Sequence, residues 1–351
     1  MIQSRKEFLR NSLSLMAGIH LMGQPSWLLK KKNAVDLTFD LHAHPGQLYK
    51  VVNGQTGADS DAVKAFASIE DNRLGGLFLS LVADSKLLVL GEKGVSVSGQ
   101  FQPGEGWAEY QRQIGIVREF LHHSTVRIAN SAADLTANGT AAFLAVEGGH
   151  FLEGDAGKLA EAYADGIRSV QLVHYAPNEL GDLQTWEEQF HGLSAAGKEV
   201  VRKMNQLGML IDVAHASYET TRQVAMLSQD PIMLSHSVLS MESDRPIAQR
   251  AITKQHARVV ADTGGLIGMW PSGFNRDFDE FVENTKRMVD VVGIDHVGIG
   301  TDMDANYKPV LTSYSEFPDL SQALMAKGLT GEEVAKIMGN NAARVIRQVI
   351  G

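Results

Sequence analysis

The chain has 351 residues, no cysteine and a formal net charge of −9 at pH 7. Without a thiol it can be neither a disulfide scaffold nor a thiolate zinc module, and it has no cysteine nucleophile or iron–sulfur cluster. Any metal ion must therefore be held by His, Asp or Glu. Hydrophobic residues make up 44% and charged residues 21%, which is ordinary for a globular protein and excludes a disordered chain.

The charge is unevenly distributed along the chain. The first 33 residues carry one acidic residue, Glu7, and six basic ones: Arg5, Lys6, Arg10, Lys30, Lys31 and Lys32. Because this segment contributes +5, the rest of the chain has a net charge near −14. Nucleic-acid binding requires clustered Lys and Arg, so a body this acidic argues against a nucleic acid as partner.

Residues 1–33 form a separate segment whose basic start and short apolar stretch are typical of an export signal. The segment resembles a twin-arginine signal, with Lys6 where the second arginine usually stands. Polar residues and Pro25 interrupt the apolar stretch, which is too short to span a bilayer. We expect an exported, periplasmic protein with no membrane span in the mature chain. The alternative is a disordered or surface-lying N-terminal helix.

Residues 34–351 form the second predicted unit, in which short apolar runs recur, many of them β-branched. Eight runs are predicted strands: Val35–Leu41, Gly75–Val82, Ala141–Val146, Arg168–Val173, Met209–Val213, Pro231–Leu234, Gly264–Met269 and His296–Gly300. Apolar residues at helical spacing predict helices at Lys198–Leu207, Ser315–Lys327 and Gly331–Val349. Alternating strands and helices imply a parallel sheet, and eight such units predict an α/β fold, a (β/α)8 TIM barrel. The alternative is an open doubly wound sheet.

Polar residues gather where the predicted strands end. In a (β/α)8 barrel the C-terminal ends of the strands form the active site. Six of the predicted ends carry histidine or a carboxylate: His42 with His44, then Glu147, His174, His215, His236 and Asp302. Because these ends would meet on one rim, the pattern predicts a metal site there.

The spacing indicates how such a site could bind metal. His42 and His44 lie two residues apart on one face of a strand, so both imidazoles can bind one cation. His215 and His236 end adjacent strands and could bind a second cation, with Glu147 bridging the two. Imidazole and carboxylate ligands without thiolate suit Zn²⁺, with Mn²⁺, Co²⁺ or Fe²⁺ as alternatives.

Two bound ions would share a water molecule and lower its pKa, which would supply a bridging hydroxide near neutral pH. Asp302 would then be the carboxylate that takes the proton of the attacking hydroxide and passes it to a leaving nitrogen. The alternative role of Asp302 is to cap a loop. The pattern therefore predicts a metal-dependent hydrolase.

These motifs resemble the renal (membrane) dipeptidase family, metallopeptidases of the amidohydrolase superfamily. The resemblance spans roughly residues 35–349 and rests on five segments in the same order: Asp40–His44, Val146–His150, Ile211–His215, Leu234–Ser237 and Val297–Asp304. It implies a dipeptidase that cleaves short peptides with a free C-terminal carboxylate at a binuclear zinc site. The family often dimerises, so a homodimer is a further expectation.

The resemblance also implies roles for residues of this chain. His174 would polarise the scissile carbonyl and stabilise the oxyanion. Arg245, nine residues after His236, would bind the carboxylate of the substrate. Asp302 would shuttle the proton.

One residue departs from the family pattern. The renal type has His-x-Asp on the first strand, whereas this chain has His42 and His44. An imidazole in place of a carboxylate makes the site one unit more positive, so we expect a more acidic bridging water. The departure keeps open a second hypothesis, another hydrolase of the superfamily such as an N-acyl-amino-acid deacylase, a lactonase or a deaminase. A third is a non-catalytic barrel that binds a metabolite or a metal, against which the full ligand set with Asp302 argues.

Overall fold

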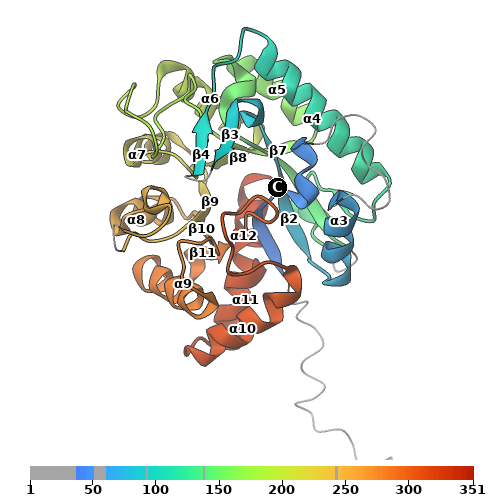
Figure 1. Ribbon diagram of the computed structural model, residues 1–351, viewed down its shortest axis with the longest axis vertical. Coiled ribbons are helices and arrows are strands. Elements are labelled where there is room, and N and C mark those ends of the chain that lie inside the picture. The colour runs from blue at the N-terminus through green and yellow to red at the C-terminus, as the bar shows by residue number, and fades with distance from the viewer. Residues whose placement is uncertain (1–36, 51–60, 92–93, 137–138, 242–243) are drawn as a thin grey trace, which may run out of the picture. The chain divides into compact units, whose positions relative to one another are not determined.

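The computed structural model describes residues 37–351 apart from residues 51–60, 92–93, 137–138 and 242–243. The predicted export segment, residues 1–33, lies outside the described residues. Leu37–Gly351 form one structural unit, in which a barrel of parallel strands lies inside a ring of helices (Figure 1).

Eight parallel strands form the barrel: β1 (Phe39–Ala43), β2 (Gly76–Val82), β6 (Ala141–Glu147), β7 (Ile167–Gln171), β8 (Leu210–Asp212), β9 (Met233–Ser237), β10 (Leu266–Met269) and β11 (Val297–Ile299). These strands pair in chain order, and pairing of β1 with β11, with Asp40 opposite Ile299, closes the circle. A short additional strand, β5 (Arg127–Ile128), pairs with β6. Each predicted strand overlaps one strand of the barrel, and the predicted (β/α)8 fold is confirmed.

Helices follow the strands, and most of them form the outer ring in Figure 1, whereas the last one lies over one end of the barrel. They are α3 (Asp61–Asp71), α4 (Glu105–His122), α5 (Leu159–Ala164), α6 (Ala195–Leu207), α7 (Tyr218–Leu227), α8 (Lys254–Asp262), α9 (Phe278–Val292), α10 (Phe317–Ala326), α11 (Gly331–Ala335) and α12 (Asn341–Val349). In α6, the Ser194 side chain caps the first turn, and Gly208 ends the helix in the left-handed region at φ 66°. Among the described residues, no helix combines the length and apolar character needed to cross a lipid bilayer.

The helix α12 packs against the N-terminal end of the barrel. Its apolar residues Val345, Ile346 and Val349 share a buried cluster with residues that begin the barrel strands: Phe39, Ala141, Leu210, Met233 and Leu266. The π-helical turn Lys336–Asn340 leads into α12 and brings Gly339 against the chain before β1. A Cβ at Gly339 would lie 2.0 Å from the backbone oxygen of Leu37, so only glycine fits. Because this end of the barrel is filled, a site open to substrate must lie at the C-terminal end.

An antiparallel hairpin that was not predicted follows β2. It consists of β3 (Leu88–Gly91) and β4 (Gly94–Val97). Gly91, Gly94 and Val95 line the same cavity as the strand-end histidines. The hairpin therefore forms one wall of the candidate site.

Candidate metal centre and its cavity

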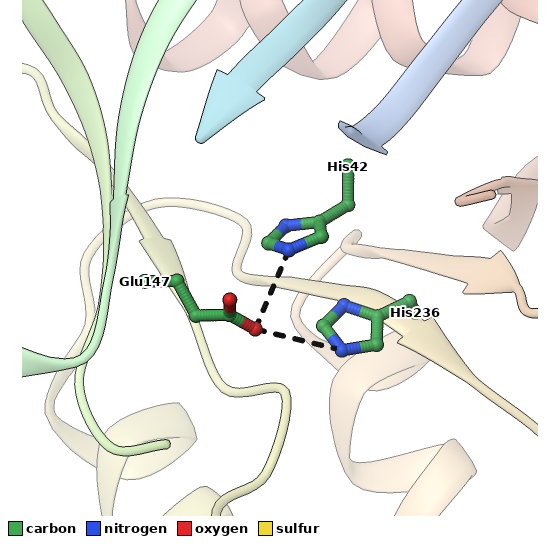
Figure 2. A group of neighbouring side chains, drawn as sticks. All are labelled: His42, Glu147 and His236. Carbon is green, nitrogen blue, oxygen red and sulfur yellow. Dashed lines mark ion pairs between the residues drawn. The ribbon is translucent and has the colours of Figure 1, made fainter. Parts of the chain in front are cut away.

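The predicted metal ligands lie together in one buried group at the C-terminal end of the barrel. They are His42 in β1, His44 just after it, Glu147 at the end of β6, His215 after β8 and His236 in β9, and Asp302 follows β11. Oε1 of Glu147 lies 3.4 Å from Nε2 of His42 and 3.8 Å from Nε2 of His236. Figure 2 marks these two pairs with dashed lines. The barrel thus brings the strand-end residues together as the sequence predicts.

Glu147 lies between two sets of possible ligand atoms. On one side, Nε2 of His44 is 3.3 Å from Oε2 of Glu147 and 3.3 Å from Oδ1 of Asp302. On the other side, Nε2 of His215 is 3.4 Å from Oε1 of Glu147 and 3.1 Å from Nε2 of His236. Imidazole nitrogens that converge on a carboxylate form a donor set suited to divalent cations.

Hydrogen bonds on the outer ring nitrogens fix the direction of three of the four imidazoles, whereas Nδ1 of His215 is buried with no partner among the described residues. Nδ1 of His44 lies 2.9 Å from the backbone oxygen of Ser80, and because a carbonyl only accepts, this nitrogen carries the hydrogen. The Ser235 hydroxyl lies 3.0 Å from Nδ1 of His236 and 3.4 Å from Nδ1 of His42. The Nε2 atoms of these rings therefore face the centre of the group. Metal-binding histidines are commonly oriented in this way, so the residues present fit a metal site.

The charges in the group favour a bound cation. Burial alone would lower the pKa of His44, but the carboxylates of Asp302 and Glu147 outweigh it and raise this pKa to about 10. Burial is the main reason why the pKa values of His215 and His236 are well below the usual range. These two rings are therefore neutral, which is the form of imidazole that binds metals. The carboxylates that attract a proton to His44 would equally attract a metal ion.

Backbone strain marks two positions of the metal-site group. His215 and Asp302 have φ values of 65° and 54°, in the left-handed region that non-glycine residues rarely adopt. Buried carboxylates hold both turns: Asp40 accepts a 2.9 Å hydrogen bond from the backbone N–H of Thr301, and Asp212 accepts one of 2.9 Å from the residue before His215. Asp40 thus positions the turn that carries Asp302.

His174 lies at the edge of the group, after β7. Its Nε2 is 3.3 Å from Oε1 of Glu147, and its Nδ1 is 2.7 Å from Oδ1 of Asp84. Burial alone would lower the pKa of His174, but the charges of Asp84 and Glu147 raise it. Asp84 was not predicted as a site residue, because the end of the second strand carries no histidine. Its position two residues after β2 is the signal that could have identified it.

The group opens into a cavity of about 320 Å³. Besides the metal-site residues and His174, four aromatic side chains line it: Tyr49, Tyr175, Trp270 and Tyr307. The Trp270 ring centroid lies 5.6 Å from that of His236. A cavity of this size with several convergent polar groups suits a small polar ligand.

A known enzyme family matches nearly the whole chain. The sequence profile of the membrane dipeptidase family, peptidase family M19, matches residues 24–350. The chain belongs to the membrane dipeptidase family. The resemblance predicted from the strand-end motifs is thereby confirmed.

Similar proteins include fungal members of this family. Dipeptidase aclJ of Aspergillus oryzae is 29% identical over 272 residues, which cover 70% of this chain and 64% of that protein. Dipeptidase tcpJ of Claviceps purpurea is 29% identical over 245 residues, which cover 65% of this chain and 56% of that protein. The match thus spans less than two thirds of the length of these relatives.

Solved structures share the barrel fold of this membrane dipeptidase family member. A metallopeptidase from Rhodobacter sphaeroides, liganded with a phosphinate mimic of L-Ala-D-Ala, has a TM-score of 0.73 at 17% identity and covers 89% of this chain and 99% of its own. An amidohydrolase from Pseudomonas aeruginosa has a TM-score of 0.70 at 22% identity, with 90% and 97% covered. These similarities support the fold.

The structure does not bring Arg245 into the metal-site group. Its guanidinium donates two hydrogen bonds of 2.8 Å to the two carboxylate oxygens of Glu280. These bonds are the main reason why the pKa of Glu280 is lowered to about 2. Arg245 lines a different cavity, of about 370 Å³. Its charge is therefore already matched by a residue outside the candidate site.

A second arginine between β9 and α8, Arg250, lies beside the site. Its side chain is buried, with the guanidinium carbon 5.4 Å from the centre of the Trp270 ring. Its Nε and Nη2 atoms have no hydrogen-bond partner in the part of the chain that the structure describes. The sequence could not show which of Arg245 and Arg250 lies beside the site, because both fall between β9 and α8.

Proposed function

We propose that this chain is a metal-dependent dipeptidase that hydrolyses the amide bond of short peptides with a free C-terminal carboxylate. The observation that carries the proposal is the buried group of four imidazoles and two carboxylates at the open end of the barrel. Membership of the membrane dipeptidase family supports the same activity.

The group would hold two divalent ions, and we propose Zn²⁺ because the ligands are imidazoles and carboxylates. His42 and His44 would hold one ion, with Asp302 beside it, His215 and His236 would hold the other, and Glu147 would bridge them. When bound, the ions would lower the pKa of a bridging water so that hydroxide is available near neutral pH.

Two side chains of the site are placed for proton transfer and polarisation. Asp302 lines the cavity with its side chain 12% exposed, and we infer that it takes the proton of the attacking water and gives it to the leaving nitrogen. His174 lines the same cavity beside Glu147. We infer that its Nε2–H donates a hydrogen bond to the scissile carbonyl oxygen.

We assign recognition of the substrate carboxylate to Arg250, in place of the predicted Arg245. A buried guanidinium with unpartnered donors is costly unless a ligand completes its hydrogen bonds. Nε1 of Trp270, which lines the cavity, is also buried without a partner among the described residues. A carboxylate can accept two hydrogen bonds from one guanidinium, which makes such pairs strong.

Arg250→Ala is expected to raise KM for dipeptides about 10–100-fold, equivalent to ~1.5–3 kcal/mol for a charged hydrogen bond. The comparison is KM for a dipeptide against KM for its C-terminal amide, which lacks the carboxylate. Arg245→Ala removes the ion pair with Glu280 and the hydrogen bond to the backbone oxygen of Phe274, both outside the metal-site group, and should leave KM unchanged. The assignment would be contradicted if Arg250→Ala raised KM equally for the amide. It would also be contradicted if Arg245→Ala raised KM for the dipeptide more than Arg250→Ala does.

The cavity also offers hydrogen-bond acceptors that suit a free amino group. Asp304 and Asn306 line it, and Oδ1 of Asn306 is buried with no partner among the described residues. An ammonium group donates to such acceptors, whereas an N-acyl group cannot replace all of its donors. This supports a dipeptide rather than an N-acyl amino acid.

The function is tested by metal analysis together with a substrate panel. The panel contains L-L, L-D and D-D dipeptides and their N-acetyl forms. We expect about two metal ions per chain and turnover of free dipeptides. Turnover of only N-acylated or cyclic compounds would move the function to the second hypothesis, another hydrolase of the superfamily, which His44 keeps open.

We also propose that the chain is exported, a proposal supported only by the basic and apolar pattern of residues 1–33. N-terminal sequencing of the protein recovered from a periplasmic fraction tests it, and recovery of the uncut chain from the cytoplasm would contradict it. The expected homodimer rests on the resemblance to the family and stays a prediction.

A further inference from the structure

Asp84 is a fully buried carboxylate that belongs to neither set of metal ligands. Its relative exposure is 0%, and Oδ1 lies 2.7 Å from Nδ1 of His174. Its other oxygen, Oδ2, accepts a 3.0 Å hydrogen bond from the backbone N–H of Ala176. Among the described residues, Asp84 is therefore connected to the site by its hydrogen bond with His174.

The hydrogen bonds to Asp84 determine which nitrogen of His174 faces the cavity. Burial alone would raise the pKa of Asp84, but the charge of His174 and the hydrogen bonds outweigh it and lower this pKa, so the carboxylate is ionised. An ionised carboxylate only accepts, which requires a hydrogen on Nδ1 of His174 in addition to the Nε2–H that the proposed function uses. Nε2 is then the nitrogen beside Glu147 and the cavity.

The turn that carries Asp84 is itself held in place. The side chain of Gln113 in α4 bonds both backbone groups of Val82, accepting from its N–H at 2.9 Å and donating to its oxygen at 2.8 Å. The backbone N–H of Ala83 donates to the backbone oxygen of Glu147 at 2.8 Å. Asp84 is therefore fixed relative to the strand end that carries the central carboxylate of the metal site.

We propose that Asp84 is a positioning residue that holds the His174 ring with Nε2 directed at the carbonyl group of the bound substrate. The proposal deepens the proposed function and rests on it for the presence of that carbonyl. A side chain held by a second hydrogen bond loses little rotational freedom when substrate binds, so its own hydrogen bond is formed at lower cost. Asp84 would thus contribute to kcat more than to substrate affinity.

A purely structural role predicts different behaviour. In that case Asp84 would only close the turn by accepting from Ala176, and its loss would lower activity whether or not His174 is present. An amide has a single acceptor atom, so asparagine must lose one of the two hydrogen bonds that Asp84 accepts. The asparagine side chain has the same size as aspartate, but it cannot accept hydrogen bonds from both His174 and Ala176.

The test is a double-mutant cycle in the zinc-loaded enzyme with the best dipeptide of the panel. We expect His174→Ala to lower kcat about 10²–10³-fold and Asp84→Asn to lower it about 10–100-fold. In the double variant, Asp84→Asn should cause no further loss, because the ring that it positions is absent. The same fold-loss in both backgrounds would overturn the proposal.

A control variant shows whether a loss of activity comes from misfolding, and a spectroscopic measurement tests the proposal without any substrate. Ser85→Ala changes the same turn but removes only a hydroxyl near Gln113 and Glu109, so it should keep kcat and metal content. The proton spectrum of the zinc-loaded protein should show a downfield Nδ1–H signal that both His174→Ala and Asp84→Asn abolish. This signal does not depend on substrate, so its persistence in Asp84→Asn overturns the proposal even if no dipeptide is hydrolysed.

Discussion

Asp302→Asn is expected to lower kcat for dipeptide hydrolysis by about 10²–10⁴-fold while the protein still folds. The amide keeps the shape of the side chain but cannot take up a proton. The carboxylate lies where a proton could be moved, because it lines the cavity and its Oδ1 is 3.3 Å from Nε2 of His44. The left-handed backbone at Asp302 is held by its own N–H, which donates to the backbone oxygen of His42 at 2.8 Å. The substitution leaves that bond in place.

The measurement compares kcat, KM and metal content per chain for Asp302→Asn and the unchanged protein. Asp295→Asn is a matched control. Asp295 lies just before the start of β11, at the other end of the strand from Asp302, and pairs with Lys336 at the surface. It should leave kcat unchanged. If Asp302→Asn retains full kcat, Asp302 takes no part in proton transfer. If it loses metal as well as activity, its main role is that of a ligand.

The barrel and the metal-site group could be predicted because both depend on local patterns. Buried parallel strands require apolar runs, and polar residues at the ends of such runs meet on one rim whatever the details of the loops. Glu147 and His236 were identified by this rule alone, although they lie 89 positions apart in the sequence. The rule needs only the order of the strands.

Residues whose role depends on a partner distant in sequence could not be identified from the strand ends. Arg245 and Arg250 follow the same strand, and what separates them is the bidentate pair of Arg245 with Glu280 in α9. Asp84 ends a strand without a histidine, and its role depends on His174, 90 residues later. Each of these pairings is a product of the folded barrel, and no periodicity in the chain signals it.

The hairpin β3–β4 was missed for a related reason. Its two strands have four residues each and, in the part of the chain that the structure describes, pair with each other and not with the barrel. Yet Gly91, Gly94 and Val95 line the cavity. The shape of the substrate pocket therefore depends on an insertion that the eightfold alternation of strands and helices does not predict.

Glu147→Gln is expected to reduce metal content from about two ions to fewer than one per chain and to lower kcat/KM by at least about 10³-fold. One carboxylate faces both sides of the site, with Oε2 toward His44 and Oε1 toward His215. The amide keeps the volume, but it replaces one oxygen ligand with an NH₂ group that cannot bind a cation. It also removes the one carboxylate of the predicted ligand set, which otherwise consists of His42, His44, His215 and His236.

Metal binding gives this prediction a readout that needs no substrate. A ligand that binds only the folded state raises the melting temperature, so added Zn²⁺ should stabilise the metal-free protein. It should stabilise Glu147→Gln much less. Glu153→Gln is the matched control, since Glu153 lies six residues later and pairs with Lys158 outside the cavity. It should bind Zn²⁺ as the unchanged chain does.

The alternative result would change the description of the site. If Glu147→Gln keeps two ions per chain, each set of imidazoles must bind its ion without a shared carboxylate. His44 makes that outcome chemically conceivable, because His42 and His44, with Asp302, form a ligand group that does not include Glu147. Loss of both ions would instead show that the central carboxylate holds the two sets together. The metal count of this one variant therefore decides between two separate sites and one bridged centre.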